Sequence, residues 1–584
     1  MVKKVLNLLF ILAFIGIFAI GAKAEESEKS DFKGKISAGY HFNDINGSTA
    51  KIGEYEDLEQ GAGDGPDLSF FLNGHGDNFS LDLGGLYGGN KNDQEYYLNG
   101  DINRIFLERY QYNRFHHSLD HDPLTNLSAV LGGPKVSHQD FDVGRDYMIY
   151  YSEQESNTTI NLPFLPGAQV SFDYRQQIRR GHKQALTMSK CAACHITSQG
   201  RTIDEETEDY KAKAQVKFGW LTLMYNFLHR DFREQANAPI NQYDEAMHPG
   251  NGVEMFDDRV QYHDENLAYS QVPSSKKDSH LIKALAALPK HTSFYLSYLN
   301  SDIENRENDL STDQDVITAR ITNRLIPGLK LNLDFRYLSL DNDDTYVDVV
   351  EPLSVAGANA GFPWNNHNPA LSYNSFDPDF TRRSAMSRDV TTVGFNARYR
   401  LLKKTTIRLD YEWEKIDRDY YEVDNGDTET KKNTIKLGLK SRLNRKLKAK
   451  IIYKRQDIDN PFNNLNAAHE VVDPSSTYGS PFAGLQYWER QEDRIATLSN
   501  QPTAINEIKT DFHWSIKPNL FLNANFSWID KENDDTNFSD WEQESYRPSL
   551  NLWYAPMERL SFNVSYMYDK TKTDSVIHMP VFDG

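Results

Sequence analysis

Two cysteines and a histidine lie together in the segment Cys191-Ala192-Ala193-Cys194-His195, and the chain of 584 residues has no other cysteine. The pattern Cys-x-x-Cys-His is the attachment motif of c-type haem. In such a site both thiols bond to the haem vinyl groups and the following histidine ligates the iron. The motif therefore predicts one covalently bound haem c, with Cys191 and Cys194 as attachment residues and His195 as an axial ligand of the haem iron.

Other uses of the cysteine pair stay open. Exported chains are oxidised, so Cys191 and Cys194 are also suited to a redox-active or structural disulfide, or to a role in assembly. A metal site is the third alternative, although two thiols and one imidazole leave the ligand set short. The second haem ligand is open as well, and the candidates are His182, Met188, His229 and His263.

Residues 1–24 form a predicted signal peptide. Lys3 and Lys4 give a positive start, residues 5–20 are almost entirely apolar, and small residues flank a cleavage site at 22–24. An uncleaved anchor helix is the weaker alternative, because the apolar run is short for a membrane span. No later segment has 18 consecutive apolar residues. We therefore expect an exported chain that is directed to the outer membrane of a Gram-negative cell.

Strict alternation of apolar and polar side chains recurs through residues 25–584. In the segment 329–337 the odd positions are Leu, Leu, Leu, Phe and Tyr, and the even positions are Lys, Asn, Asp and Arg. The same pattern is found at 210–218, 407–414, 520–528 and 560–568. A period of two predicts β-strands with one apolar face. The low hydrophobic fraction of 39% suits a membrane barrel, in which only alternate residues face lipid.

Short turns alternate with long polar loops between the predicted strands. We expect turns at 288–291, 326–328, 402–404, 443–446, 516–519 and 555–558, and long loops at roughly 233–277, 342–387 and 459–502. Outer-membrane barrels combine tight periplasmic turns with long external loops, whereas two packed sheets have no reason to do so. The sequence therefore predicts an all-β fold, a large transmembrane antiparallel β-barrel of about 20–26 strands.

Charged residues occupy the face that would point into this barrel. They are Lys330, Asp334, Arg336, Arg408, Asp410, Glu412, Glu414, Lys436, Lys440, Lys448 and Lys450. A barrel of this size is too wide for side chains to fill, so its lumen is expected to hold water, a plug or another protein. The net charge of −20 is spread along the chain and argues against nucleic acid as a partner.

The cysteine motif lies between two predicted strands, one around 168–175 and one at 210–218. Residues 178–205 are therefore expected to form a loop, either on the side of the long loops or folded into the mouth of the lumen. One haem cannot carry electrons across a membrane core of ~30 Å. A haem in this loop would therefore be one station in a chain of haems that a partner supplies.

The end of the chain does not match a closed barrel. After a strand that ends near Asp569, residues 571–584 are expected to form an external loop, from which a closed barrel would return in a further strand. The closing C-terminal strands are therefore expected to be missing, or else the strands near the N-terminus are miscounted.

A signal peptide, a large polar-lined barrel and a Cys-x-x-Cys motif together resemble the MtrB/PioB family of outer-membrane porins. The resemblance covers most of the mature chain as architecture and is specific at 191–201. It implies a sheath that holds a periplasmic multihaem c-type cytochrome in its lumen and docks an extracellular multihaem cytochrome. Many relatives carry Cys-x-x-Cys near the mature N-terminus, whereas residues 25–190 contain no cysteine here.

The sequence therefore favours a non-enzymatic sheath in outer-membrane lipid that aligns a cytochrome for extracellular electron transfer. The alternative is a general or substrate-specific diffusion porin in which the cysteine pair is structural. A barrel enzyme or adhesin is the third hypothesis, and no catalytic constellation stands out for it. Carboxylate-rich segments at 341–344 and 532–535 have the residue types of Ca²⁺ sites, although solvated loop tips are the simpler interpretation.

Overall fold

The computed structural model describes the larger part of the chain. The described residues are 31–42, 46, 54, 65–88, 93–125, 137–165, 167–190, 195–243, 265–343, 345–348, 379–382, 387–418, 429–461, 468–472, 486–490, 501–533 and 541–575. The predicted signal peptide, Cys191 and Cys194 lie outside these residues. No described segment is a helix that is long and apolar enough to cross a membrane.

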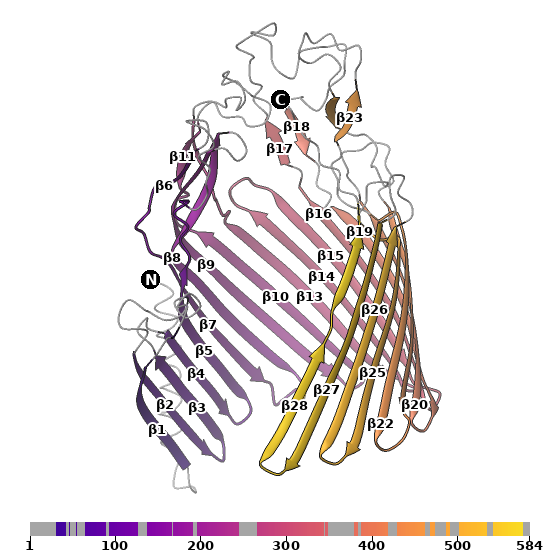
Figure 1. Cartoon of the computed structure of the whole chain (residues 1–584). Helices are drawn as coiled ribbons and strands as arrows, with labels where there is room; N and C mark the ends of the chain where they lie inside the picture. Colours follow the sequence, from indigo (N-terminus) through magenta and orange to yellow (C-terminus); the bar gives the residue numbers. More distant parts are fainter. Residues whose placement is uncertain are drawn as a thin grey trace. The chain divides into compact units, whose positions relative to one another are not determined.

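β-Strands make up most of the described residues, and 23 of them are assigned to a large sheet (Figure 1). These strands are β1 (Asp31–His41), β2 (Gly65–Gly76), β3 (Phe79–Gly88), β4 (Asp93–Ile102), β5 (Phe106–Leu119), β6 (Ser137–Asp140), β7 (Tyr147–Asn161), β8 (Gln169–Lys190), β9 (His195–Phe218), β10 (Leu221–Glu234), β13 (Ser275–Leu288), β14 (Thr292–Asn305), β15 (Ser311–Asn323), β16 (Leu329–Asn342), β19 (Arg388–Leu402), β20 (Thr405–Asp417), β21 (Thr430–Arg442), β22 (Leu447–Asp459), β25 (Ala504–Lys517), β26 (Leu520–Asn533), β27 (Trp541–Met557), β28 (Leu560–Met567) and β29 (Lys570–Asp574). The count agrees with the 20–26 strands expected from the sequence.

Three further strand pairs form small separate sheets. They are β11 (Ile240–Tyr243) with β12 (Glu265–Ala268), β17 (Thr345–Asp348) with β18 (Asp379–Arg382), and β23 (Ala468–Val472) with β24 (Gln486–Arg490). Each pair falls within one of the three long connections that the sequence predicts. The described parts of these connections therefore contain short strands as well as irregular backbone.

The chain divides into two compact units. The first unit comprises residues 1–116 and 152–163, and the second comprises 117–151 and 164–584. In the first unit, β1 to β5 form an antiparallel meander in which each strand is hydrogen bonded to the next. The buried carboxylate of Glu108 in this unit accepts a hydrogen bond from Ser156 Oγ at 2.7 Å.

The second unit is a longer meander of the same kind. From β8 to β27 each strand of the large sheet pairs antiparallel with the next one along the chain, and both β28 and β29 pair with β27. From β10 to β26, every described pairing of the large sheet is thus made to the next or the previous strand of that sheet along the chain. Such local pairing is typical of up-and-down β-barrels.

The six predicted turns are confirmed, and all of them lie at the same end of the second unit. Pairings such as Leu288 with Thr292 and Leu402 with Thr405 close these hairpins within a few residues. Gly328 has a φ of +84° in the turn before β16, a conformation that side chains with a Cβ rarely adopt. The long connections are at the opposite end, so the asymmetry of a membrane barrel is present in the structure.

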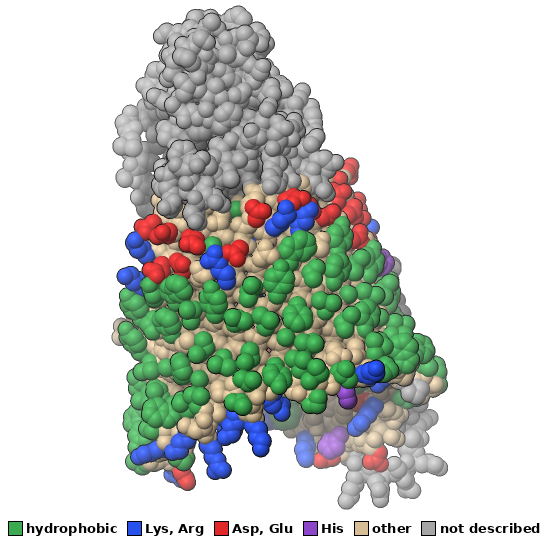
Figure 2. All heavy atoms as spheres, turned by 90° about the vertical axis from the view of Figure 1, so that its right-hand side faces the viewer, with side chains coloured by type: hydrophobic (Ala, Val, Ile, Leu, Met, Phe, Trp, Pro, Cys, Tyr) green, Lys and Arg blue, Asp and Glu red, His purple; other side chains and the backbone are tan. Residues whose placement is uncertain are grey.

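Alternation places the apolar side chains of the second unit on its outer face. Leu333, Leu437 and Tyr453 are exposed there, and only twelve apolar side chains among the described residues are buried. Figure 2 shows a broad hydrophobic belt on this face, with charged side chains along both of its edges. An exposed apolar belt of this size is stable against hydrocarbon rather than water. The barrel strands therefore have the lipid-facing surface that their sequence pattern predicts.

Two expectations about strand ends are wrong. Residues 178–205 were expected to form a loop, but all of them except 191–194 belong to the paired strands β8 and β9. Residues 571–584 were also expected to be a loop, yet 571–574 are part of β29, which pairs with β27. Both segments are polar on both faces, so the period-two signal is absent from them. The remainder of the C-terminus, 576–584, lies outside the described residues.

Candidate functional site

The two strands that flank the cysteine motif form the longest described hairpin. β8 has 22 residues and β9 has 24, whereas β13 and β14 have 14 each. β8 ends at Lys190, β9 begins at His195, and their backbones are paired at these two residues. These two residues lie at the end of the second unit where the long connections are found. Residues 191–194 themselves lie outside the described residues, so the position of the two thiols stays a prediction.

A polar segment covers one face of the β8–β9 hairpin at the end near Lys190 and His195. We call it the polar strap, and it consists of residues 120–125 and 137–145, which include β6. β6 runs parallel to the start of β9, with Ser137 opposite His195 and Asp140 opposite Ser198. The amide of Phe141 donates to the carbonyl of Ser198 at 2.9 Å. The strap therefore holds the backbone of β9 immediately after the motif.

Side-chain hydrogen bonds join the strap to both strands of the hairpin. Gln184 Nε2 of β8 donates to the carbonyl of Asp122 at 2.6 Å and to Ser198 Oγ at 3.0 Å. The amide of Gly200 donates to Asp142 Oδ2. A glycine also permits the close approach of β7 to β8, because a Cβ at Gly181 would lie 2.0 Å from the carbonyl oxygen of Met148. The hairpin is thus fixed along this whole face.

The short β11–β12 hairpin covers the opposite face. Gln199 Nε2 donates to the carbonyl of Ile240 at 2.7 Å, and Thr197 Oγ1 lies 3.4 Å from Asn241 Oδ1. Odd-numbered residues of β9 contact β11, whereas Ser198 and Gly200 contact the strap, as expected for a strand with alternating faces. Both faces of β9 thus have contacts just after the motif, and between them Ser198 is 0% exposed.

Asp140 is the central acceptor beneath the motif. Its buried carboxylate accepts hydrogen bonds from Ser198 Oγ at 2.8 Å and from the Nε2–H of His121 at 2.6 Å. Burial alone would raise the pKa of Asp140, but the hydrogen bonds from Ser198, His121 and the amide of Asp142 outweigh it and lower the pKa. The folded strap therefore favours the ionised carboxylate.

Replacing Asp140 with asparagine is expected to loosen the strap. The change removes a charged acceptor from two hydrogen bonds and should cost roughly 1–3 kcal/mol of local stability. Hydrogen exchange of the amides in 195–200 measures this opening. Because the folded pKa lies below 3.8, the stabilisation is present above that value and is lost as the pH falls through the folded pKa. The wild-type strap should therefore lose stability in acid, whereas the strap of the Asp140→Asn variant should not show this dependence on pH.

The exposed Asp120 offers a matched control, because Asp120→Asn removes the same charge from the neighbouring backbone. Faster exchange in Asp120→Asn than in Asp140→Asn would contradict the role assigned to Asp140.

His138 is the histidine that sequence reasoning missed. Its backbone in β6 is opposite Ile196, the residue directly after His195. Both ring nitrogens are buried, and neither has a hydrogen-bond partner among the described residues. A buried imidazole normally has at least one partner. His138 therefore offers ring nitrogens without a described partner next to the strand that follows the motif. No local sequence pattern could have identified this histidine.

The predicted candidates for a second haem ligand are placed as follows. His182 Nδ1 on β8 accepts from the Arg145 guanidinium at 3.0 Å, and burial together with Arg145 lowers the pKa of His182. His229 Nδ1 on β10 is 2.6 Å from Asp278 Oδ1. Met188 lies on β8 opposite Ile196, and His263 lies outside the described residues. His182 and His229 therefore already have polar partners.

The acidic segments do not form a described metal site. Asp341 is opposite Asp313, which is in turn opposite Asp302. Burial and then these neighbouring carboxylates raise the pKa of Asp313, as expected when like charges adjoin. Among the described residues, no group of three histidine, cysteine or acidic side chains is placed to hold a metal ion. Residues 344 and 534–535 lie outside the described part.

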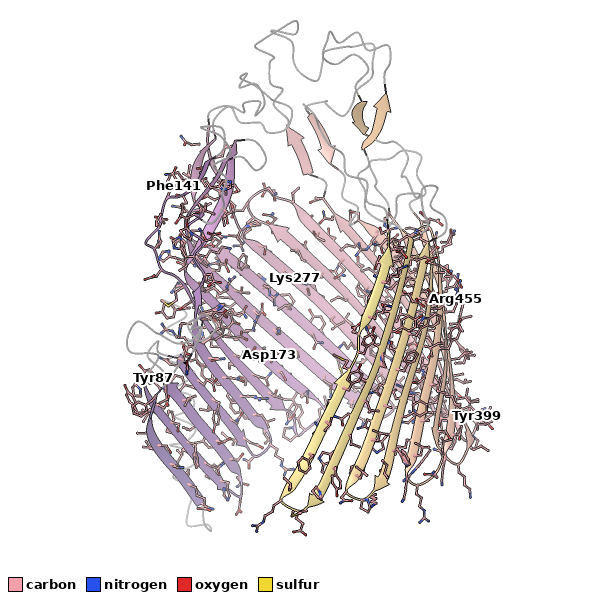
Figure 3. All side chains as sticks on the ribbon, viewed as in Figure 1. Tyr87, Phe141, Asp173, Lys277, Tyr399 and Arg455 are labelled. Carbon is pink, nitrogen blue, oxygen red and sulfur yellow. The ribbon has the colours of Figure 1, made fainter. Side chains whose placement is uncertain are left out.

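The predicted charged side chains share the inner face of the second unit. Figure 3 shows Asp173 and Lys277 on its concave side, and Tyr399 and Arg455 on its outer side. Cross-strand register places Lys330 on this inner face as well, by the same alternation. The inner wall is thus polar and charged along its length, as the sequence predicts.

Ion pairs join neighbouring strands on this wall. Lys432 Nζ lies 2.9 Å from Glu414 Oε1, and Arg320 pairs with Asp334. Nearer the turns, positive charges adjoin one another instead. Such a wall cannot pack against an apolar core, because each charge would lose its hydration. It suits a water-filled lumen or a polar protein.

One protein family matches most of the chain. The sequence profile described as "Putative outer membrane beta-barrel porin, MtrB/PioB" aligns with residues 67–579. No curated protein sequence matches the chain.

Solved structures of other outer-membrane proteins are similar to the chain at low identity. A ferric enterobactin receptor, PfeA, from Pseudomonas aeruginosa is 11% identical, with 92% of this chain and 75% of that chain covered at a TM-score of 0.43. A siderophore receptor, PiuA, from Acinetobacter baumannii is 11% identical, with coverage of 92% and 77% and a TM-score of 0.40.

Proposed function

This chain belongs to the MtrB/PioB family of outer-membrane β-barrel porins, and from that premise we propose that it is the sheath of a transmembrane electron conduit. In this role it holds a periplasmic multihaem c-type cytochrome in its lumen and aligns it with an extracellular multihaem cytochrome. The chain itself catalyses no reaction. It insulates the partner's haems from lipid and sets their position across the outer membrane.

The observation that carries this proposal is the charged inner wall behind a lipid-facing belt. A polar inner wall is found in water-filled channels as well, and it is also what a protein occupant needs, because such an occupant makes polar contacts along the wall. The inner face offers charged and amide side chains from successive strands over the full height of the meander. The wall therefore supports a sheath for a polar protein, and the family membership supports an outer-membrane location.

We further propose that the hairpin apex carries one haem c. Cys191 and Cys194 would supply the thioether bonds and His195 one nitrogen ligand of the iron, and His138, whose backbone is opposite Ile196, is the proposed source of the second. The residues present fit the group, because His138 is a buried imidazole whose two ring nitrogens lack partners among the described residues. A bound haem would supply one reversible electron-transfer step. The strap and β11 hold the hairpin so that this station keeps a fixed position.

Co-purification tests the sheath. The mature chain, expressed in a host that makes multihaem cytochromes and extracted in mild detergent, is expected to retain a haem protein in about equimolar amount. Haem absorbance per barrel, measured after size-exclusion chromatography, gives this ratio. The bound cytochrome should also close the lumen, so planar-bilayer conductance should rise when it is removed at high salt.

An unrelated outer-membrane porin from the same cells is the control for contamination. A barrel that conducts ions openly as isolated, and that carries no more haem protein than the control porin, would refute the sheath and favour a diffusion porin.

A further inference from the structure

A recess in the inner wall is lined by one cation from each of five adjacent strands. The recess has a volume of about 410 Å³. Its cations are Lys330 of β16, Arg398 of β19, Arg408 of β20, Lys440 of β21 and Lys450 of β22, and its other lining residues are uncharged. No described carboxylate lines the recess, although the chain as a whole carries a net charge of −20. The charge of the recess is therefore positive, whereas the net charge of the chain is negative.

Strand register brings these cations next to one another. Lys330 is directly opposite Arg398, which is directly opposite Arg408, and Lys440 is directly opposite Lys450. Like charges at directly opposite positions of an antiparallel pair destabilise the sheet. The arrangement therefore has an unfavourable electrostatic energy that a bound anion would offset.

Few carboxylates compensate this charge. Arg408 pairs with Asp410 at 2.7 Å, and Lys450 pairs with Asp511 at 3.0 Å. In the part of the chain that the structure describes, Lys330, Arg398 and Lys440 have no ion-pair partner. All five side chains remain accessible to solvent, and those from β19 to β22 are largely exposed. Their charges are therefore available to an occupant of the lumen.

Glycine makes room for contact at the centre of the recess. Gly438 of β21 is opposite Arg408 on one side and Ile452 on the other. A Cβ at this position would lie 3.4 Å from Arg408 Cβ, so a larger side chain would fill the hollow. The backbone of β21 is consequently uncovered between the cations.

The width of the array indicates the kind of ligand. Five adjacent strands at a spacing of about 4.8 Å extend over about 19 Å. A single phosphate or carboxylate cannot contact cations spread over that distance. We infer that the recess docks an acidic face of the protein held in the lumen, with several carboxylates spaced along it, an inference that rests on the proposed function.

The wall above the recess gives this docking a direction. Further from the turns, the inner face carries charges of both signs, and Asp334 is paired with Arg320 and Glu414 with Lys432. An occupant with its acidic face toward the turns meets the cationic row, whereas the reverse orientation meets this mixed and paired part of the wall. Complementary charge of this kind fixes orientation more than it adds affinity.

Binding of a labelled dodecaglutamate peptide to the detergent-solubilised mature chain tests the recess. Fluorescence anisotropy at low salt should show saturable binding to the wild-type chain. The triple variant Lys330→Gln, Arg398→Gln and Lys440→Gln should bind about tenfold more weakly, because three uncompensated charges are lost. The same variant should retain less haem protein on purification.

The control variant Lys403→Gln, Lys404→Gln and Arg445→Gln removes three positive charges from the turns and should bind as the wild type does. An equal loss in this control would overturn the inference, because the attraction would then be nonspecific. Displacement of the peptide by an equal concentration of inorganic phosphate would also overturn it and indicate a small-anion site. Unchanged peptide affinity in the recess variant, with haem protein retained, contradicts this inference alone. Peptide binding without any haem protein contradicts the proposed function.

Discussion

An arginine at Ala524 should lower the free energy of unfolding in lipid by about 2–4 kcal/mol. Ala524 is the middle one of five apolar residues on the outer face of β26, between Leu522 and Phe526, and its cross-strand neighbours are Phe512 and Leu550. The substitution removes no large side chain, so its cost is that of placing a guanidinium in hydrocarbon. Urea unfolding of the chain in phospholipid vesicles measures the difference.

Asn525→Arg is the matched control, because the adjacent residue points to the inner face. Asn525 is exposed and donates one long hydrogen bond, to Ser549 Oγ at 3.3 Å. An arginine there remains in contact with a polar lumen and should change the stability by less than about 1 kcal/mol. Equal costs at the two positions would show that the faces of β26 are wrongly assigned, and the barrel with them.

Loss of covalent haem is the second large effect, and it is expected to be complete. The wild-type chain, made in a host with cytochrome c maturation, should stain for haem after reduction and denaturation, because thioether bonds survive both. Cys191→Ser with Cys194→Ser should abolish the stain, since no other cysteine is available. His138→Gln should keep the stain and change the absorption spectrum, because it removes only the proposed second nitrogen ligand.

His182→Gln is the control for this series, because His182 already accepts from Arg145. It should leave both the stain and the spectrum unaltered. An unstained wild-type chain whose mass, before reduction, is two hydrogens below that of the dithiol would instead establish a Cys191–Cys194 disulfide. In that case the haem proposal fails, whereas the sheath proposal stands.

The barrel strands could be predicted from the sequence because their two faces have different surroundings. Lipid outside and polar groups inside force a period of two, as at 329–337, and tight turns interrupt it at regular intervals. The ends of β8 and β9 within 178–205 could not be predicted in this way. There the strap covers one face and β11 the other, so neither face needs apolar residues and the alternation is absent. β29 was missed because residues 570–574 are polar on both sides, so that strand lacks the alternation as well.

The candidate sites were predictable only in part. Spacing alone identified Cys191, Cys194 and His195, because these residues are contiguous. His138 becomes relevant only when β6 lies beside β9, a contact between residues 57–58 positions apart that no local pattern encodes. The inner charges were predicted one strand at a time, but the cationic recess depends on register between strands, which sequence periodicity does not supply.

Connectivity has a consequence for how such proteins diversify. From β13 to β26 every strand of the large sheet pairs only with its neighbours of that sheet along the chain, and the six tight turns lie at one end. Removing one hairpin, such as β15 with β16, would leave β14 and β19 with compatible directions and free edges. The sheet can therefore gain or lose two strands at a time without a change in the connections of the other strands. Duplication or deletion of the gene segment for one hairpin would thus fit the barrel diameter to a wider or narrower occupant.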